Sequence, residues 1–124
     1  MRDFLKKNSL FLLIVVLAIG LRFVVIGKVP PALNWDEISH GYNAYSLLKT
    51  GKDEWGVTLP TIFRAYGDYK LPVYIYLTAV SELIFGLNIF SVRLPSILAG
   101  VMTVVFTYLL AKKLFDPHRK VGSK

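Results

Sequence analysis

Three apolar runs constrain this chain more than any other feature of its sequence. They cover residues 9–27, 71–87 and 94–111, and the first contains a single charged residue, Arg22. A helix formed by the nineteen residues of the first run is about 28 Å long, close to the thickness of the hydrocarbon core of a bilayer. We therefore expect three transmembrane helices, and the predicted fold class is an all-α membrane protein.

The composition supports a membrane protein and argues against nucleic-acid binding. Hydrophobic residues make up 54% of the 124 residues and charged residues 19%, against about 25% charged residues in soluble domains. The net charge of +7 comes from basic residues that flank the apolar runs, where they suit anionic lipid headgroups. No basic and aromatic groove pattern accompanies them, so we predict no nucleic-acid partner. The chain has no cysteine, which excludes disulfides and thiolate metal sites.

Basic residues before the first run predict the orientation of the chain. Arg2, Lys6 and Lys7 place the N-terminus in the cytoplasm and residues 28–70 outside the plasma (inner) membrane. A cleaved signal peptide is the alternative, but the run is long and no small-residue cleavage site follows it. Three spans also place the C-terminus outside, which conflicts with the five basic residues found there: Lys112, Lys113, Arg119, Lys120 and Lys124.

The loop of residues 28–70 contains one predicted helix. Two prolines at 30 and 31 end the first helix, and Asn34 is suited to cap a new helix with Asp36 and Glu37 in its first turn. Gly51 marks its end. Four residues at helical spacing give this helix one apolar face: Ile38, Tyr42, Tyr45 and Leu48. We expect a short amphipathic helix on the membrane surface, followed by an irregular segment at residues 52–70.

Three charged residues lie within or beside the predicted spans. Arg22 is either an anchor that reaches the headgroups or an inward-facing partner for an anion. Glu82 lies in the inner third of the second span, so we assign it to helix packing. Arg93 lies in the connection between the second and third spans, which the predicted topology places in the cytoplasm. We assign Arg93 a structural role.

Five motifs in order carry a resemblance to a known family. They are Asp36-Glu37, residues 44–51, Tyr69-Lys70-Leu71-Pro72, Phe85-Gly86 and Arg93-Leu94-Pro95-Ser96. This order resembles the start of the GT-C type membrane glycosyltransferases that use polyprenyl-phosphate sugars, which include the protein O-mannosyltransferases and lipid A aminoarabinose transferases of glycosyltransferase family 39. Family members often have Lys-Pro-Pro where this chain has Lys70-Leu71-Pro72. They also have many more spans, so residues 1–124 are interpreted as the N-terminal portion of such an enzyme, without activity alone.

The resemblance implies sugar transfer from a polyprenyl-phosphate donor to a lipid, glycan or protein acceptor on the outer membrane face. It places the catalytic base on Asp36 and favours a phosphate contact for Lys70. We also expect Glu37, His40 and Tyr69 to take part in substrate binding. Because successive helical residues point about 100° apart, Asp36 and Glu37 do not aim at one atom. His40 and Glu37 are too few ligands for a metal site, so we predict no metal site and no cofactor; a divalent metal is not excluded, but the sequence does not support one.

The alternative is a small non-catalytic membrane protein, an assembly partner or anchor, that uses the acidic loop as a docking site. The length of the chain favours this alternative, and the order of the motifs favours the transferase.

Overall fold

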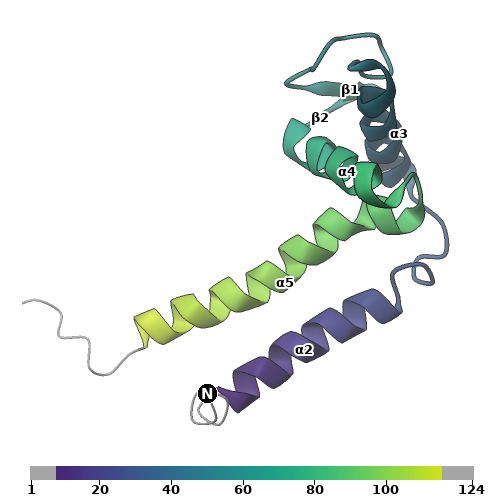
Figure 1. Cartoon of the computed structure of the whole chain (residues 1–124). Coiled ribbons are helices and arrows are strands. Elements are labelled where there is room, and N and C mark those ends of the chain that lie inside the picture. The colour runs from purple at the N-terminus through teal and green to yellow at the C-terminus, as the bar shows by residue number, and fades with distance from the viewer. Residues whose placement is uncertain (1–7, 116–124) are drawn as a thin grey trace, which may run out of the picture.

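The computed structural model describes residues 8–115 and is mostly helical (Figure 1). Its elements, in chain order, are α2 (Ser9–Val24), α3 (Trp35–Thr50), β1 (Phe63–Ala65), β2 (Asp68–Lys70), α4 (Pro72–Phe85) and α5 (Ile89–Leu114). Six of the basic residues used to predict orientation lie outside the described residues: Arg2, Lys6, Lys7, Arg119, Lys120 and Lys124.

Helices α2 and α5 lie side by side and run in opposite directions (Figure 1). Phe11 near the start of α2 stacks on Tyr108 near the end of α5, with ring centroids 4.0 Å apart. At the other end of α2, the Arg22 side chain packs on Gly100 of α5. The remaining elements, α3, the two strands and α4, gather at the end of this helix pair where α2 finishes and α5 begins.

The buried core lies in this terminal unit rather than between α2 and α5. It consists of Ala44 and Leu47 on α3, Phe63 on β1, and Ile75 and Ala79 on α4. Each of these side chains is at most 8% exposed. Burial of these apolar groups supplies the main force that holds α3, the strands and α4 together.

Helix α3 has the bounds that its capping residues predict, but it buries another face. Asn34 caps its first turn and Gly51 ends it in the left-handed conformation, with φ 70°. The apolar side chains predicted to form one face are all exposed: Ile38, Tyr42, Tyr45 and Leu48. The face packed inside the protein carries a different set of residues, most of them small or polar: Ser39, Gly41, Asn43, Ala44 and Leu47. A membrane-surface location for the exposed face stays a prediction.

Residues 52–70 contain a β-hairpin that the all-α prediction omitted. Strands β1 and β2 are antiparallel, with Phe63 opposite Lys70 and Ala65 opposite Asp68. Tyr66 and Gly67 join them, and both have positive φ angles, 48° and 83°. Two such residues form the tight turn whose twist matches that of paired strands. Strands of three residues are too short to produce a readable sequence pattern, so the sequence indicated only turns.

The predicted apolar runs correspond to three helices of unequal length. Among the described residues, α5, with 26 residues, is the one helix that is long and apolar enough to cross a membrane. Helix α4 has 14 residues, which gives about 21 Å, less than the roughly 30 Å of a hydrocarbon core. The predicted count of three spans is therefore not confirmed.

Helix α5 begins five residues earlier than the predicted third span. The side chain of Asn88 accepts a hydrogen bond from the backbone N–H of Ser91 and caps the helix at Ile89. Pro95 therefore lies inside α5 rather than in its first turn. The missing N–H of Pro95 removes one hydrogen bond within the helix.

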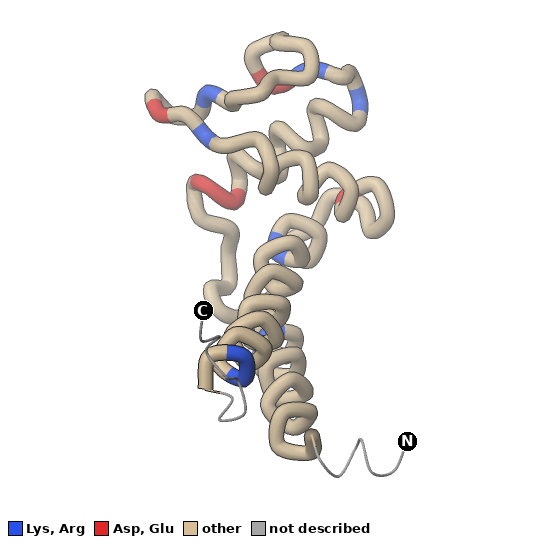
Figure 2. Tube along the Cα trace, turned by 90° about the vertical axis from the view of Figure 1, so that its left-hand side faces the viewer, with Lys and Arg blue, Asp and Glu red and all other residues tan. Residues whose placement is uncertain are grey.

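Charge and apolar surface separate along the molecule. Every Asp and Glu among the described residues lies between positions 36 and 82, in the unit at the end of the helix pair (Figure 2). Helices α2 and α5 expose large apolar side chains, including Leu13, Val16, Leu98, Met102 and Phe106. Apolar surface of this kind is the type that lipid covers in a membrane protein.

Candidate active site

The first turn of α3 is closed by reciprocal hydrogen bonds between Asn34 and Glu37. The backbone N–H of Glu37 donates to Asn34 Oδ1 at 2.8 Å, and the backbone N–H of Asn34 donates to Glu37 Oε2 at 3.0 Å. This capping box satisfies two N–H groups that have no partner within the helix. It also turns the Glu37 carboxylate back toward the helix start, away from the direction of Asp36.

Arg93 on α5 holds the same carboxylate and the chain that leads to it. Its Nε donates to Glu37 Oε1 at 2.8 Å and its Nη2 to Glu37 Oε2 at 3.1 Å. The backbone carbonyls of Ile26, Pro30 and Ala32 accept three further hydrogen bonds of 2.6–2.9 Å. The predicted topology separates Arg93 from the acidic loop, and this separation is wrong, because Arg93 contacts Glu37. Arg93 lies beside the acidic loop and fixes its conformation.

The pairing with Arg93 sets the charge state of Glu37. The hydrogen bond from the Arg93 guanidinium is the largest influence and lowers the pKa of Glu37; burial acts in the opposite direction, and the Asn34 backbone N–H adds to the lowering. Glu37 is thus an ionised acceptor whose two oxygens are occupied. Such a carboxylate is suited to positioning rather than to taking a proton.

Asp36 is free of this network and faces Lys70 instead. Lys70 Nζ lies 2.9 Å from Asp36 Oδ1 and 3.1 Å from Asp68 Oδ2. The Asp36 side chain is 61% exposed and that of Lys70 20%. The hydrogen bonds to Asp36 and Asp68 raise the pKa of Lys70, so its ammonium stays charged. The hairpin produces this contact, because β2 returns the chain to the start of α3.

His40 lies one turn after Asp36 and packs against Tyr74 of α4, with ring centroids 4.8 Å apart. Burial is the largest influence on this imidazole and lowers its pKa, while the nearby charge of Asp36 raises it. The neutral ring is therefore favoured. In residues 8–115, no group of three His, Asp or Glu side chains is arranged to hold a metal ion.

A cavity of about 410 Å³ is lined by side chains of α2, α3, α4 and α5. Asp36, Glu37 and His40 line it from α3, Tyr74 from α4, and Arg93 from α5. Arg22, at the end of α2, completes the charged lining. The cavity combines an exposed carboxylate with cationic groups, which is the combination that proton removal next to an anionic leaving group requires.

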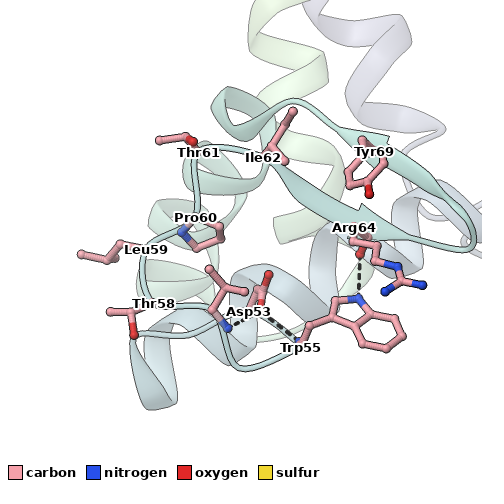
Figure 3. Close-up of a pocket in the computed structure, with 10 residues that line it drawn as sticks. Asp53, Trp55, Thr58, Leu59, Pro60, Thr61, Ile62, Arg64 and Tyr69 are labelled. Atoms are coloured by element: carbon pink, nitrogen blue, oxygen red, sulfur yellow. Dashed lines mark hydrogen bonds between the residues drawn. The ribbon is translucent and has the colours of Figure 1, made fainter.

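Tyr69 does not lie with this group. Alternation along β2 directs it away from Lys70, and it lines a different cavity with Trp55 and Arg64 (Figure 3). There the Trp55 indole N–H donates to the Arg64 carbonyl at 2.9 Å, and the Arg64 guanidinium lies 4.7 Å from the Trp55 ring. The Asp53 carboxylate accepts the backbone N–H of Trp55 at 2.9 Å and closes the turn.

The sequence did not predict that Tyr74 and Arg93 line this cavity. Tyr74 was interpreted as part of a span, but its hydroxyl donates to the Val92 carbonyl at 2.8 Å and ties α4 to α5 beside the site. Arg93 was placed on the opposite side of the membrane. Its motif, Arg93-Leu94-Pro95-Ser96, was noticed, yet only the short length of α4 indicates that this motif lies near the acidic loop.

Comparison with known proteins connects the site to a family. Residues 69–122 match the family described as dolichyl-phosphate-mannose-protein mannosyltransferase. That match includes Lys70 and Arg93 and begins after Asp36. The undecaprenyl phosphate-alpha-4-amino-4-deoxy-L-arabinose arabinosyl transferase 1 of Pseudomonas fluorescens is 33% identical over 90 residues, which are 71% of this chain and 16% of that protein. No solved structure matches the chain.

The chain thus spans about a sixth of the length of the curated relative that it matches. The two matches concern proteins whose printed names describe sugar transfer from a polyprenyl phosphate carrier, and the family match includes three of the five motifs, from Tyr69 to Ser96. They bear out the predicted resemblance: the chain is similar to members of the GT-C type membrane glycosyltransferases.

Proposed function

We propose that this chain forms the acidic-loop part of an enzyme that transfers a sugar from a polyprenyl-phosphate donor to a lipid, glycan or protein acceptor. The observation that carries the proposal is the contact between Asp36, which lines the cavity, and Lys70, whose Nζ lies 2.9 Å from Asp36 Oδ1. It brings a proton acceptor and a cation to one place, and the transfer reaction needs both.

The reaction forms a bond between an acceptor hydroxyl or amine and the anomeric carbon of the sugar. The bond from that carbon to the phosphate oxygen breaks, and the polyprenyl phosphate leaves with the bonding electrons. The acceptor proton passes to the Asp36 carboxylate, which acts as general base. Cationic side chains stabilise the negative charge that develops on the departing phosphate.

Asp36 suits the base role better than its neighbour Glu37. Both oxygens of Glu37 accept hydrogen bonds from Arg93, and Oε2 also closes the capping box. Asp36 has one strong partner, Lys70, and its side chain is largely exposed. Glu37 therefore holds the loop in place, and Asp36 remains accessible to an acceptor.

Lys70 is assigned the first contact with the donor phosphate. Its ammonium has three N–H groups, and two of them are directed to Asp36 and Asp68. A phosphate that approaches Lys70 competes with Asp36 for this cation. Donor binding would then weaken the ion pair and leave the Asp36 carboxylate a better base, so that the base becomes active when the donor is present.

We further propose that α2 and α5 cross the inner membrane and that α4 stays on the outer side with the acidic loop. The antiparallel arrangement of α2 and α5 supports this topology, as does the short length of α4. Lys112 and Lys113 then lie on the side where the chain enters α2, which is cytoplasmic by the positive-inside rule. The conflict created by three spans disappears.

The docking-loop alternative is weakened by the engagement of both acidic side chains. Arg93 pairs with Glu37 and Lys70 pairs with Asp36, so the two carboxylates carry little net negative charge with which to attract a basic partner.

Asp36→Asn in the complete natural protein tests the proposal. With an undecaprenyl-phosphate sugar as donor, we expect turnover to fall by about 10²-fold or more while donor binding is largely kept. Asp68→Asn is the matched control, because Asp68 contacts the same lysine but does not line the cavity. Retained turnover in Asp36→Asn removes Asp36 from the base role.

A further inference from the structure

Arg22 is a cation whose hydrogen-bonding capacity the protein leaves mostly unused. Its Nη1 donates to the carbonyl of Ala18, one turn earlier in α2, at 3.1 Å. Within residues 8–115, no carboxylate lies at ion-pair distance from its guanidinium. A guanidinium has five N–H donors. A charge in an apolar helix is costly without a partner, and the remaining donors are available to a ligand that carries acceptor oxygens.

The other two cations near Asp36 are already occupied. Arg93 donates to both oxygens of Glu37 and to three backbone carbonyls. Lys70 is shared by Asp36 and Asp68, so the phosphate contact proposed for it requires the displacement of a carboxylate. Of the two arginines that line the site cavity, Arg22 is the one that retains free donors.

The packing of α5 leaves room for the Arg22 side chain. A Cβ added to Gly100 would lie 2.8 Å from Arg22 Nε and 3.3 Å from Nη2. The guanidinium therefore lies directly against the backbone of α5, in space that any side chain at position 100 would fill. Glycine at this position keeps the guanidinium between the two helices.

Arg22 also lines a second cavity, of about 470 Å³, between α2 and α5. Its lining is mostly apolar and includes Phe11 and Ile14 on α2 and Val104, Thr107 and Tyr108 on α5. From position 22 to position 11, α2 rises about 16 Å. Arg22 thus stands where a polar cavity that contains Asp36 meets an apolar cavity that follows the helix pair.

We propose that Arg22 binds the phosphate of the lipid-linked donor and that the apolar cavity between α2 and α5 holds the first part of its isoprenoid chain. This inference rests on the proposed function and specifies how its donor is held. The guanidinium fork matches phosphate geometry, and the apolar walls match the hydrocarbon. The sugar then extends into the cavity lined by Asp36.

Binding of undecaprenyl phosphate to the complete natural protein in detergent tests the inference without any turnover. We expect Arg22→Gln to raise the Kd by about tenfold or more, because charge-assisted hydrogen bonds are lost. Arg22→Lys keeps the positive charge but loses the forked guanidinium, so its Kd should lie between those of the wild type and Arg22→Gln. Arg64→Gln is the matched control, since Arg64 lies in the other cavity, and its Kd stays at the wild-type value.

Undecaprenol, which lacks the phosphate, separates a phosphate contact from a packing effect. Arg22→Gln is expected to leave its binding unchanged, whereas Val104→Trp, which fills the apolar cavity, weakens the binding of both lipids. Equal affinity of wild type and Arg22→Gln for undecaprenyl phosphate overturns the inference. It is also overturned if Arg22→Gln loses as much affinity for undecaprenol as for undecaprenyl phosphate. If the wild-type protein binds neither lipid, the inference also fails. The Asp36→Asn transfer assay then still decides on the proposed function separately.

Discussion

Arg93 and Glu37, 56 positions apart in the chain, are joined by hydrogen bonds of 2.8 and 3.1 Å between the guanidinium and both carboxylate oxygens. This pair connects the first turn of α3 to the first half of α5. Asp36 precedes Glu37 directly, so the orientation of the proposed base depends on the pair.

Removal of the Arg93 guanidinium should destabilise the fold and disorder the loop before α3. The Arg93 side chain is 8% exposed, and its loss leaves the Glu37 carboxylate unpaired. We expect Arg93→Gln to lower the free energy of unfolding by roughly 3 kcal/mol, measured by denaturation in detergent. Arg64→Gln, an exposed arginine, should change it by less than about 0.5 kcal/mol. An unchanged stability in Arg93→Gln would falsify a structural role for the pair.

The stability contribution of Glu37 should depend on pH below its ordinary pKa. Arg93 holds the pKa of Glu37 below the usual value of 4.5, so the folded protein binds this proton less readily than the unfolded chain. The contribution is complete above about pH 4.5 and is lost as the pH falls through the folded-state pKa. Unfolding followed between pH 6 and pH 3 should show this loss in the wild type. In Glu37→Gln the corresponding part of the pH dependence should be missing.

His40 should affect stability in a higher pH range. Burial lowers its pKa from 6.5, so below about pH 6.5 the unfolded chain takes up a proton that the folded protein resists. Stability from the neutral ring is therefore present above pH 6.5 and decreases as the pH falls toward the folded-state pKa. Titration of the imidazole by NMR measures this directly. A midpoint at or above 6.5 contradicts the prediction, and His40→Gln should remove the associated change in stability.

Local features of the sequence predicted the helices of this fold but not the β-hairpin. The apolar runs predicted α2, α4 and α5. Asn34 and Gly51 predicted both ends of α3, because caps depend on a few adjacent residues.

Relationships between distant segments were harder to predict. The Arg93–Glu37 pair and the Asp36–Lys70 contact require that α4 stays with the acidic loop. The sequence pattern of α4, apolar with a single glutamate, is equally typical of a short span and of a packed helix. When α4 is interpreted as a span, Arg93 is expected on the side of the membrane opposite to the acidic loop, whereas it contacts Glu37 in that loop. The family resemblance predicted site roles for Asp36 and Lys70, but their contact depends on the β1–β2 hairpin. Strands of three residues are too short to show the alternating sequence pattern of a strand.

Gly41 on α3 provides a test of how closely α3 approaches α5. A Cβ at this position would lie 2.8 Å from Cγ2 of Val92, which is 1% exposed, and 3.5 Å from the buried Glu82 carboxylate. A β-branched side chain that is fully buried has no other rotamer available without displacing its neighbours. We expect Gly41→Ala to destabilise the fold by about 1–3 kcal/mol and to reduce transfer, because it pushes the helix that carries Asp36 away from α5.

Gly20 on α2 is the matched control for this substitution. No heavy atom lies within 4 Å of a Cβ built there, and alanine is favoured over glycine inside a helix by up to about 1 kcal/mol. Gly20→Ala should therefore leave the midpoint of thermal unfolding unchanged or raise it, whereas Gly41→Ala lowers it. The same response from both variants would mean that the general helix preference for alanine dominates and that α3 does not press on Val92. A Gly41→Ala, Val92→Ala double variant separates these effects: since the smaller side chain at 92 removes the close contact, the added methyl at 41 should cost less in that background than in the wild type.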